Sequence, residues 1–246
     1  MSRAVNEETA TQAMPLHLFR GAAERRYADR LKAELDVVEA SLLEQLAFAS
    51  KVADAPARYL AEAGGKRVRP MLTLLTSELG DGPNELVRRA AIAVELTHLA
   101  SLYHDDVMDD AHLRRGVPAA HTVWSNSVAI LAGDLLFARA SSLVSGMSEE
   151  AILLQAQTFE RLCLGQLHET VGPEPGDDPM AHYLQVLADK TGALISTAAR
   201  MGVMFSNAPA EYADPVTEYG ERIGVAFQLI DDVIDLSPKA AQTGKL

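Results

Sequence analysis

Two groups of aspartates have the spacing that a divalent metal ion requires. Asp105, Asp106, Asp109 and Asp110 lie close together in the segment HDDVMDD. On a helix, residues four apart point from one face, so Asp105 pairs with Asp109 and Asp106 with Asp110. Like charges one turn apart repel each other unless a cation is bound, and carboxylate oxygens at this density suit Mg²⁺. Taken alone, this cluster is equally well interpreted as a solvated acidic helix end.

The second group is Asp231, Asp232 and Asp235 in the segment FQLIDDVIDL. Gly224, Gln228 and two of these aspartates form one polar stripe along a helix whose other residues are strongly apolar. We therefore expect a core helix, in which carboxylates are costly unless they are paired or bound to metal. Two such helices facing each other across a bundle could hold several Mg²⁺ ions around one diphosphate.

Basic residues could supply a second anion site. Lys66, Arg67 and Arg69 follow a Gly-Gly pair, which allows close backbone approach, and their side chains can bind phosphate oxygens. Arg114 and Arg115 follow the first aspartate cluster. A basic run by itself is usually a solvated turn. Together with the carboxylates, these residues indicate two anion sites, one rich in metal and one free of it.

Helices must position these residues. Apolar and small residues recur every three or four positions in several segments, the clearest being Leu31, Leu35, Val38, Leu42 and Leu46, and Leu86, Ala90, Val94, Thr97 and Ser101. Residues 80–83, 171–179 and 206–215 are connectors rich in Gly, Pro, Asp or Asn. No segment alternates long enough to predict a strand. The expected fold is one all-α domain of about eight to ten helices.

Composition narrows the partners. The 246 residues are 48% hydrophobic and carry a net charge of -12, which disfavours nucleic acid and anionic membranes as main partners. The single cysteine, Cys163, cannot form an internal disulfide, so we expect a cytoplasmic protein, with this thiol buried between Leu162 and Leu164. No uncharged apolar run approaches about 18 residues, so no transmembrane segment is predicted.

The motifs GGKRVRP, HDDVMDD followed by RRG, GQ, KT and FQLIDDVID occur in this order from about Glu62 onward. In these motifs the sequence closely resembles the trans-isoprenyl diphosphate synthases, or polyprenyl synthetases. The resemblance implies an all-α isoprenoid synthase fold, a helical bundle around a central cavity, usually forming a homodimer. It places the synthetase domain at residues 26–246, after a partly ordered N-terminal extension at 1–25. It also implies further C-terminal helices, so that this chain would be C-terminally truncated.

The resemblance also implies residue roles. The allylic diphosphate would be held by three Mg²⁺ ions bound to Asp105, Asp106, Asp109, Asp231, Asp232 and Asp235. Isopentenyl diphosphate would be bound by Lys66, Arg69, His98 and Arg115. Contacts to the allylic diphosphate would come from Arg114, Lys190 and Lys245, and polar groups near the reacting carbon from Thr191 and Gln228. Gln166 is a further expected substrate contact. The residues expected to take part in catalysis are Asp105, Asp106, Lys190, Thr191 and Gln228.

The implied reaction condenses isopentenyl diphosphate with a geranyl, farnesyl or geranylgeranyl diphosphate by ionisation, condensation and elimination. In this family the residues before the first aspartates limit product length. Ala100 and Ser101 are small, which is typical of products of roughly C30 to C50, with transient membrane contact for product release. The alternatives are a C15 or C20 synthase, in which Phe137, Leu136 or Phe159 blocks the cavity, a class I terpene cyclase, and a non-catalytic synthase subunit.

Overall fold

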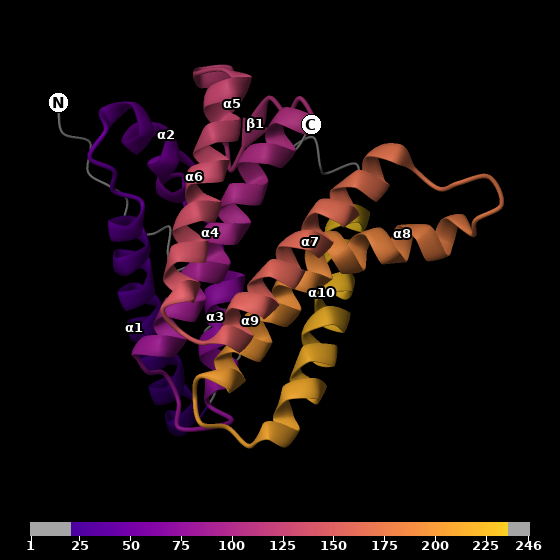
Figure 1. Cartoon of the computed structure of the whole chain (residues 1–246). Helices are drawn as coiled ribbons and strands as arrows, with labels where there is room; N and C mark the ends of the chain where they lie inside the picture. Colours follow the sequence, from indigo (N-terminus) through magenta and orange to yellow (C-terminus); the bar gives the residue numbers. More distant parts are fainter. Residues whose placement is uncertain (1–20, 236–246) are drawn as a thin grey trace.

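A computed structural model describes residues 21–235, which form an all-helical chain with one small hairpin (Figure 1). The elements in chain order are α1 (Ala22–Gln45), α2 (Lys51–Glu62), α3 (Val68–Ser77), α4 (Glu85–Met108), β1 (Leu113–Arg114), β2 (Val117–Pro118), α5 (Ala120–Val123), α6 (Asn126–Ser145), α7 (Glu149–Val171), α8 (Pro179–Leu187), the π-helical turn η3 (Ala188–Gly192), α9 (Ala193–Met204), the 3₁₀ turn η4 (Ala210–Tyr212) and α10 (Ala213–Asp235). The prediction of an all-α fold is confirmed.

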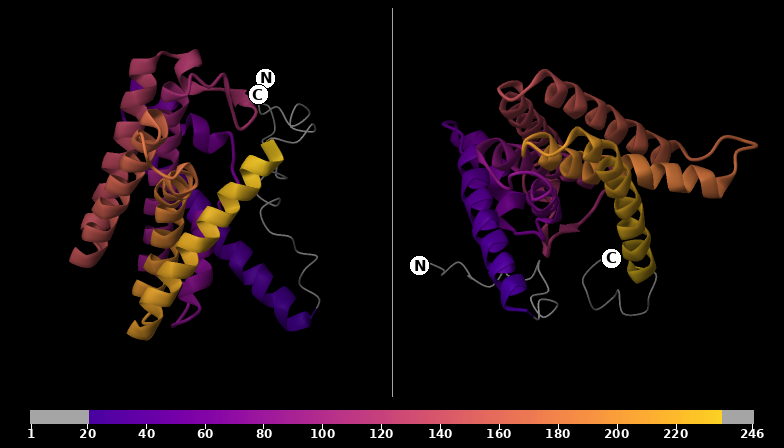
Figure 2. Two further views of the ribbon diagram at one scale, coloured as in Figure 1. Left: turned by 90° about the vertical axis from the view of Figure 1, so that its right-hand side faces the viewer. Right: turned by 90° about the horizontal axis from the view of Figure 1, so that it is seen from below.

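Helix α4 lies at the centre of the bundle. It packs along α6 on one side and against α3, α9 and α1 on the others, and about half of its residues are buried. Seen from below, α1 and α10 flank α3 and α4, while α7 and α8 extend to one side (Figure 2). The core is built largely from leucine, alanine and valine, which lets the helices approach closely. One rigid helix therefore carries the first aspartate cluster out of the core.

The predicted α1 periodicity is confirmed by burial, since Leu31, Val38 and Leu42 face the core along one stripe. The predicted α4 periodicity is confirmed only in part: Ala90 and Val94 are buried, but Leu86 is exposed. Every α4 residue from Ala90 to Thr97 is buried, because this central helix is covered on several sides.

The hairpin β1–β2 was not predicted. Leu113 pairs with Pro118 and Arg114 with Val117, and the two central residues of the turn, Arg115 and Gly116, both have positive φ (53° and 77°). This is the geometry of tight hairpin turns, usually signalled by Asn-Gly or Asp-Gly rather than Arg-Gly. The hairpin is functionally relevant because it fixes the positions of two predicted site arginines.

Two burial predictions were wrong. Cys163 is exposed on α7, because the inward stripe of that helix passes through Leu162 and Gly165 instead. Helix α10 is not a core helix within the described residues, since Phe227 is 38% and Ile230 61% exposed. Its opposite face packs against η3 and α9. Apolar composition indicated burial, but it could not specify which face is covered.

Helix α6 is the one helix among residues 21–235 that is long and apolar enough to cross a membrane by length and composition alone. About a third of its most apolar window (33%) is buried, and it packs along α4. A core helix of a globular protein passes the same test, so this is weak evidence for a membrane span.

Close packing of α10 on the π-helical turn predicts a destabilising Gly224→Ala substitution. A Cβ at Gly224 would lie 2.7 Å from the Cα of Gly192. Helix propensity alone would stabilise the variant by about 1 kcal/mol, whereas overpacking costs about 1–3 kcal/mol. We expect a net loss of unfolding free energy in urea denaturation. Ala226→Gly, at an exposed position of α10, should show the propensity effect alone, and a stabilised Gly224→Ala would contradict the packing argument.

Candidate active site

The first aspartate cluster lies at the C-terminal end of α4. Asp105 and Asp106 are in its last turn, and Asp109 is its C-cap. Asp110 follows outside the helix with φ 50°, is exposed, and lies near His121 (Nε2 to Oδ1 3.6 Å). The predicted pair Asp105 and Asp109 is consistent with this placement. The second predicted pair, Asp106 with Asp110, does not form, because the helix ends before Asp110.

Asp105 is destabilised as a carboxylate. Burial raises its pKa to about 6, and the nearby charges of Asp109 and Glu169 act in the same direction, while Lys190 and Arg114 oppose them. The electrostatic environment of Asp105 thus includes Glu169 of α7 and Lys190 of η3, which are far away in the sequence. A group of this kind gains from a bound cation, which favours its charged form.

Asp106 points to the other side and is fully buried. Arg114, carried by β1, donates from Nε (2.7 Å) and lies within 2.5 Å through Nη2, both to Oδ1. The other oxygen, Oδ2, is buried without a hydrogen-bond partner. Arg114 was predicted to contact the allylic diphosphate, and here it neutralises Asp106 and leaves one carboxylate oxygen unpaired.

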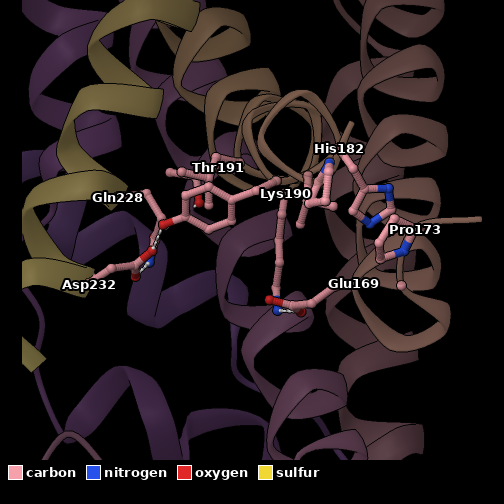
Figure 3. Close-up of a pocket in the computed structure, with 12 residues that line it drawn as sticks. Glu169, Pro173, His182, Lys190, Thr191, Gln228 and Asp232 are labelled. Atoms are coloured by element: carbon pink, nitrogen blue, oxygen red, sulfur yellow. Dashed lines mark hydrogen bonds and ion pairs between the residues drawn. The ribbon is translucent and has the colours of Figure 1, made fainter. Parts of the chain in front are cut away.

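The second aspartate cluster forms a hydrogen-bonded network with η3 and α8 (Figure 3). The Thr191 hydroxyl donates to Gln228 Oε1 (3.1 Å), and Gln228 Nε2 donates to Asp232 Oδ1 (2.9 Å). The Tyr183 hydroxyl donates to the other oxygen of Asp232. Asp231 is half-buried beside this network, and Asp235 is the last residue of α10, whose side chain lies outside the described part of the chain, as does all of Lys245.

Lys190 and Thr191 are positioned by a π-helical turn, a feature that often marks functional sites. Arg161 of α7 holds this turn by donating to Asp189 (2.7 Å) and to Glu221 of α10 (2.6 Å). Lys190 extends toward α7 and pairs with Glu169 (Figure 3). Glu169, Lys190 and Thr191 line a cavity of about 360 Å³ together with Gln228 and Asp232.

The carboxylates fit Mg²⁺ only together with a substrate. Within residues 21–235, no three His, Cys, Asp or Glu side chains converge closely enough to hold an ion by themselves. Mg²⁺ typically takes one or two carboxylates and completes its octahedron with water and phosphate oxygens. Asp106 has an unpaired Oδ2, and Asp105 has a raised pKa that a bound cation would lower. Both observations agree with an ion held jointly by protein carboxylates and a substrate.

The cationic residues gather at the junction of α2, α3, α4 and the hairpin. Arg115 donates from Nη1 to the carbonyls of Leu60 (2.7 Å) and Gly64. Gly65 must lack a side chain here, since a Cβ would lie 2.9 Å from the Arg115 guanidinium. Lys66 is exposed, and its ammonium lies 6.0 Å from the Phe227 ring centre. The segment just before α3 therefore lies close to α10.

Arg69 and His98 complete this cationic cluster. Burial lowers the pKa of Arg69 to about 10, so it remains charged at neutral pH, and its Nε is buried without a hydrogen-bond partner. Burial, followed by the repulsion of Arg69 and Arg115, lowers the pKa of His98 well below its ordinary value. His98 is therefore neutral near pH 7, and it can donate one hydrogen bond without adding to the positive charge.

Arg67 does not face this space, although its residue type alone allowed it to bind phosphate as Lys66 and Arg69 were expected to do. Its guanidinium donates to Glu39 (2.6 and 2.8 Å) and to Glu95 (2.9 Å). Burial alone would lower the pKa of Arg67, but these two carboxylates raise it above its ordinary value. The run of basic letters could not distinguish a ligand contact from an internal ion pair.

The remaining predicted residues lie deeper. Gln166 of α7 is buried, and its Oε1 has no partner among the described residues. Ser101 is half-buried one turn below Asp105 and bonds to the carbonyl of His98 (2.9 Å). Ala100 is fully buried, with its carbonyl close to Gly133 of α6.

Sequence reasoning missed several residues of these networks, among them Glu39, Glu95, Glu169 and Tyr183. Glu95 is 1% exposed and Glu169 pairs with Lys190. A lone acidic residue on the inward stripe of a helix was the available signal for Glu95, since α4 buries that face. Nothing local marks Tyr183 or Glu39, whose partners lie 49 and 28 residues away.

The raised pKa of Asp105 predicts a stability change that can be measured in the metal-free chain. Because the folded pKa (about 6) exceeds the unfolded value of 3.8, ionised Asp105 opposes folding above pH 6, and this cost disappears as the pH falls toward 4. Asp105→Asn should therefore raise the unfolding free energy at pH 7.5 by up to about 3 kcal/mol in EDTA, and flatten its dependence on pH. Asp110→Asn should do neither. Equal stability of wild type and Asp105→Asn at neutral pH would contradict the assignment.

Comparison with known proteins agrees with this arrangement. The family model for polyprenyl synthetase matches residues 50–246. A nonaprenyl diphosphate synthase of Mycobacterium tuberculosis is 42% identical over 221 residues, covering 89% of this chain and 66% of the relative. The chain spans about three fifths to two thirds of the length of the curated relatives it matches.

Solved structures share the fold. A decaprenyl diphosphate synthase from Rhodobacter capsulatus superposes with a TM-score of 0.81 at 32% identity, covering 88% of this chain and 67% of that one. A geranylgeranyl pyrophosphate synthase from Corynebacterium glutamicum, solved with calcium and isoprenyl diphosphate, gives 0.78 at 42% identity, covering 87% and 66%. With its helical bundle, two aspartate clusters and cationic cluster in place, this chain belongs to the polyprenyl synthetase family.

Proposed function

We propose that the protein condenses isopentenyl diphosphate with an allylic diphosphate and releases diphosphate. The observation that supports this most directly is the convergence of carboxylates and cations from distant parts of the chain. Asp105 at the end of α4 lies in the field of Lys190 and Arg114, and the cluster of Arg69, Arg115 and Lys66 extends from His98 of α4 to Phe227 of α10. Two diphosphate substrates require this combination, one bound through metal and one bound by side chains alone.

Side chains of the described residues can bind and orient both substrates in this reaction. Mg²⁺, when bound, would supply charge stabilisation for the departing diphosphate. Lys190 and Arg114 are cations beside Asp105 that can exchange their carboxylate partners for diphosphate oxygens. Neutral His98 and charged Arg69 orient isopentenyl diphosphate, and Thr191 and Gln228 present polar atoms toward the reacting carbon. No side-chain base stands out, so the leaving diphosphate is the proposed proton acceptor.

The two alternatives receive less support. A terpene cyclase needs no second, metal-free cationic site, whereas this chain builds one from several elements. A non-catalytic subunit has no need of its aspartates, yet the residues of both clusters are present in the sequence.

For product length we propose a chain of roughly C30 to C50. Ser101 is small and half-buried one turn before Asp105, so its side chain would obstruct a growing chain less than an aromatic one would. Ala100 is buried toward α6 and contributes by its small size at a tight helix contact. The competing proposal, a C15 or C20 product, would place the block at Phe137 and Phe159, whose rings pack at 4.3 Å between α6 and α7.

The proposed assembly is a homodimer in the cytoplasm. Both α6 and α7 carry exposed apolar residues that a second copy of the chain could cover: Ile130, Leu131, Leu135, Ile152 and Leu153. The unpaired, exposed Cys163 favours a reducing compartment. Transient contact with a membrane would let an apolar product leave the protein.

The reaction predicts that removing one carboxylate from either cluster abolishes turnover. Asp105→Asn and Asp231→Asn should each lower incorporation of labelled isopentenyl diphosphate into extractable lipid by at least about a hundredfold, and EDTA should do the same. Asp110→Asn should remain close to wild type. Since Asp105→Asn is expected to fold more stably, lost activity cannot be attributed to unfolding. Retained activity in both variants would refute a two-metal-cluster mechanism.

Product length is tested by sizing the extracted prenyl chains. The wild type should give products of roughly C30 or longer, and Ser101→Phe should shorten them to roughly C15 to C20, because the ring would fill the space below Asp105. A wild-type product that already ends at C20, with Ser101→Phe unchanged, would retain the chemistry and reject the proposed length. In that case Phe159→Ala should lengthen the product.

A further inference from the structure

Helix α1, which lies outside the region matched by the family model, makes direct contact with Arg67, which stands in the sequence between Lys66 and Arg69 of the cationic cluster. Glu39 of α1 accepts two hydrogen bonds from Arg67, at 2.6 Å from Nε and 2.8 Å from Nη2. The same guanidinium donates to Glu95 of α4 (2.9 Å) and to the carbonyl of Ala61 in α2 (3.0 Å). One arginine thus joins three helices through side chains and backbone.

The backbone of Arg67 explains why this anchor matters for binding. Arg67 is in the left-handed conformation (φ 47°, ψ 36°) and is the N-cap of α3. Left-handed geometry is unfavourable for a residue with a Cβ, at a cost of about 1–2 kcal/mol. The fork of hydrogen bonds to Glu39 and Glu95 offsets that cost. Because Lys66 precedes and Arg69 follows within the same turn, the conformation of Arg67 sets the direction of both.

Glu95 connects the anchor to the opposite side of the cluster. Its Oε1 bonds to Arg67 and lies 4.0 Å from Nη2 of Arg115. Glu95 also attracts Arg69, which has no bonding partner at Nε. If Arg67 moves, Glu95 is free to turn toward Arg115 or Arg69 and withdraw them from a ligand.

We propose that Glu39 is a positioning residue for the isopentenyl diphosphate site, acting through Arg67 and Glu95 rather than by touching the substrate. This inference rests on the proposed function, since it concerns the metal-free site of that reaction. It assigns a role in substrate binding to α1, a helix that carries none of the recognised motifs.

Charge and geometry make opposite predictions for this residue. Glu39→Gln removes a negative charge close to an anion site, which by Coulomb attraction alone would tighten diphosphate binding. Loss of the anchor would loosen Arg67 and misplace Lys66 and Arg69, which would weaken it. Glu39 is about one-third exposed (32%), so solvent screens its charge, whereas the hydrogen-bond geometry is not screened. We therefore expect weaker binding.

The chain offers a matched control on the same helix. Glu34 accepts two hydrogen bonds from Arg88, at 2.7 and 3.0 Å, and its side chain is 26% exposed. Glu34→Gln thus removes an equivalent bidentate ion pair between α1 and α4, with no connection to the cationic cluster. Both variants should lose similar thermal stability.

The experiment is equilibrium binding of isopentenyl diphosphate and of inorganic diphosphate by calorimetry, in EDTA, to wild type and to both variants. Glu39→Gln should bind isopentenyl diphosphate about tenfold more weakly, equivalent to about 1.4 kcal/mol, and Glu34→Gln should equal wild type. In turnover with Mg²⁺, Glu39→Gln should raise KM for isopentenyl diphosphate and leave KM for the allylic substrate unchanged. Arg67→Lys should weaken binding similarly, and adding Glu39→Gln to it should cause little further loss, because both act through one contact.

The outcomes separate the two levels of the argument. Wild-type chain that binds neither ligand would overturn the proposed function itself. Wild-type binding with an unchanged or tighter Glu39→Gln would overturn only the positioning role, in favour of simple charge effects. Equal weakening in Glu34→Gln and Glu39→Gln would also overturn it, since the effect would then be general destabilisation.

Discussion

A single, almost fully buried carboxylate offsets the charge repulsion among the clustered arginines. Glu95 sits on α4 with 1% of its surface exposed, bonded to Arg67 and 4.0 Å from Arg115. Buried charges cost several kcal/mol each unless they are paired and hydrogen-bonded. The same helix carries Asp105 ten residues later, about 15 Å along the axis. One rigid element therefore supplies the counter-charge of the cationic cluster and a carboxylate of the proposed metal site, so their separation is fixed.

The two sites differ in how far they are prepared for a ligand. Arg115 of the cationic cluster and the neighbouring Arg67 are held by backbone carbonyls and carboxylates that need not be displaced. In the aspartate clusters, by contrast, the charged groups are paired with protein side chains that a ligand would have to displace. Lys190 pairs with Glu169, and Asp232 accepts from Tyr183 and Gln228. Binding at the first site is thus largely preorganised, whereas binding at the second requires an exchange of partners.

Spacing and chemical type predicted much of this site from sequence. The i, i+4 placement of Asp105 and Asp109 follows from helix geometry and is found in the structure. The polar stripe predicted through Gln228 is found only in part, because Gln228 bonds to Asp232, which that stripe left out, and not to Asp231. What could not be predicted depends on tertiary contacts. Arg67 faces inward because it pairs with Glu39 and Glu95. Asp110 lies outside the helix because α4 ends at Met108. The hairpin turn uses Arg-Gly instead of a common turn pair. The apolar residues of α10 were expected in a core, but periodicity does not reveal which neighbours cover a face.

Backbone strain and charge coincide at two positions of the cationic site. Arg67 and Arg115 are among the few residues other than glycine with positive φ in residues 21–235, at 47° and 53°. Glycine adopts this conformation at little cost, so it would relieve local strain at either position while deleting a guanidinium. The same replacement would also remove the contacts that each guanidinium makes. Without Arg67, the buried Glu95 and the half-buried Glu39 would lose their hydrogen bonds, and without Arg115 so would the carbonyls of Leu60 and Gly64. Because breaking a buried ion pair costs about 3–5 kcal/mol and left-handed backbone only about 1–2 kcal/mol, folding itself favours arginine over glycine at Arg67 in spite of the strain.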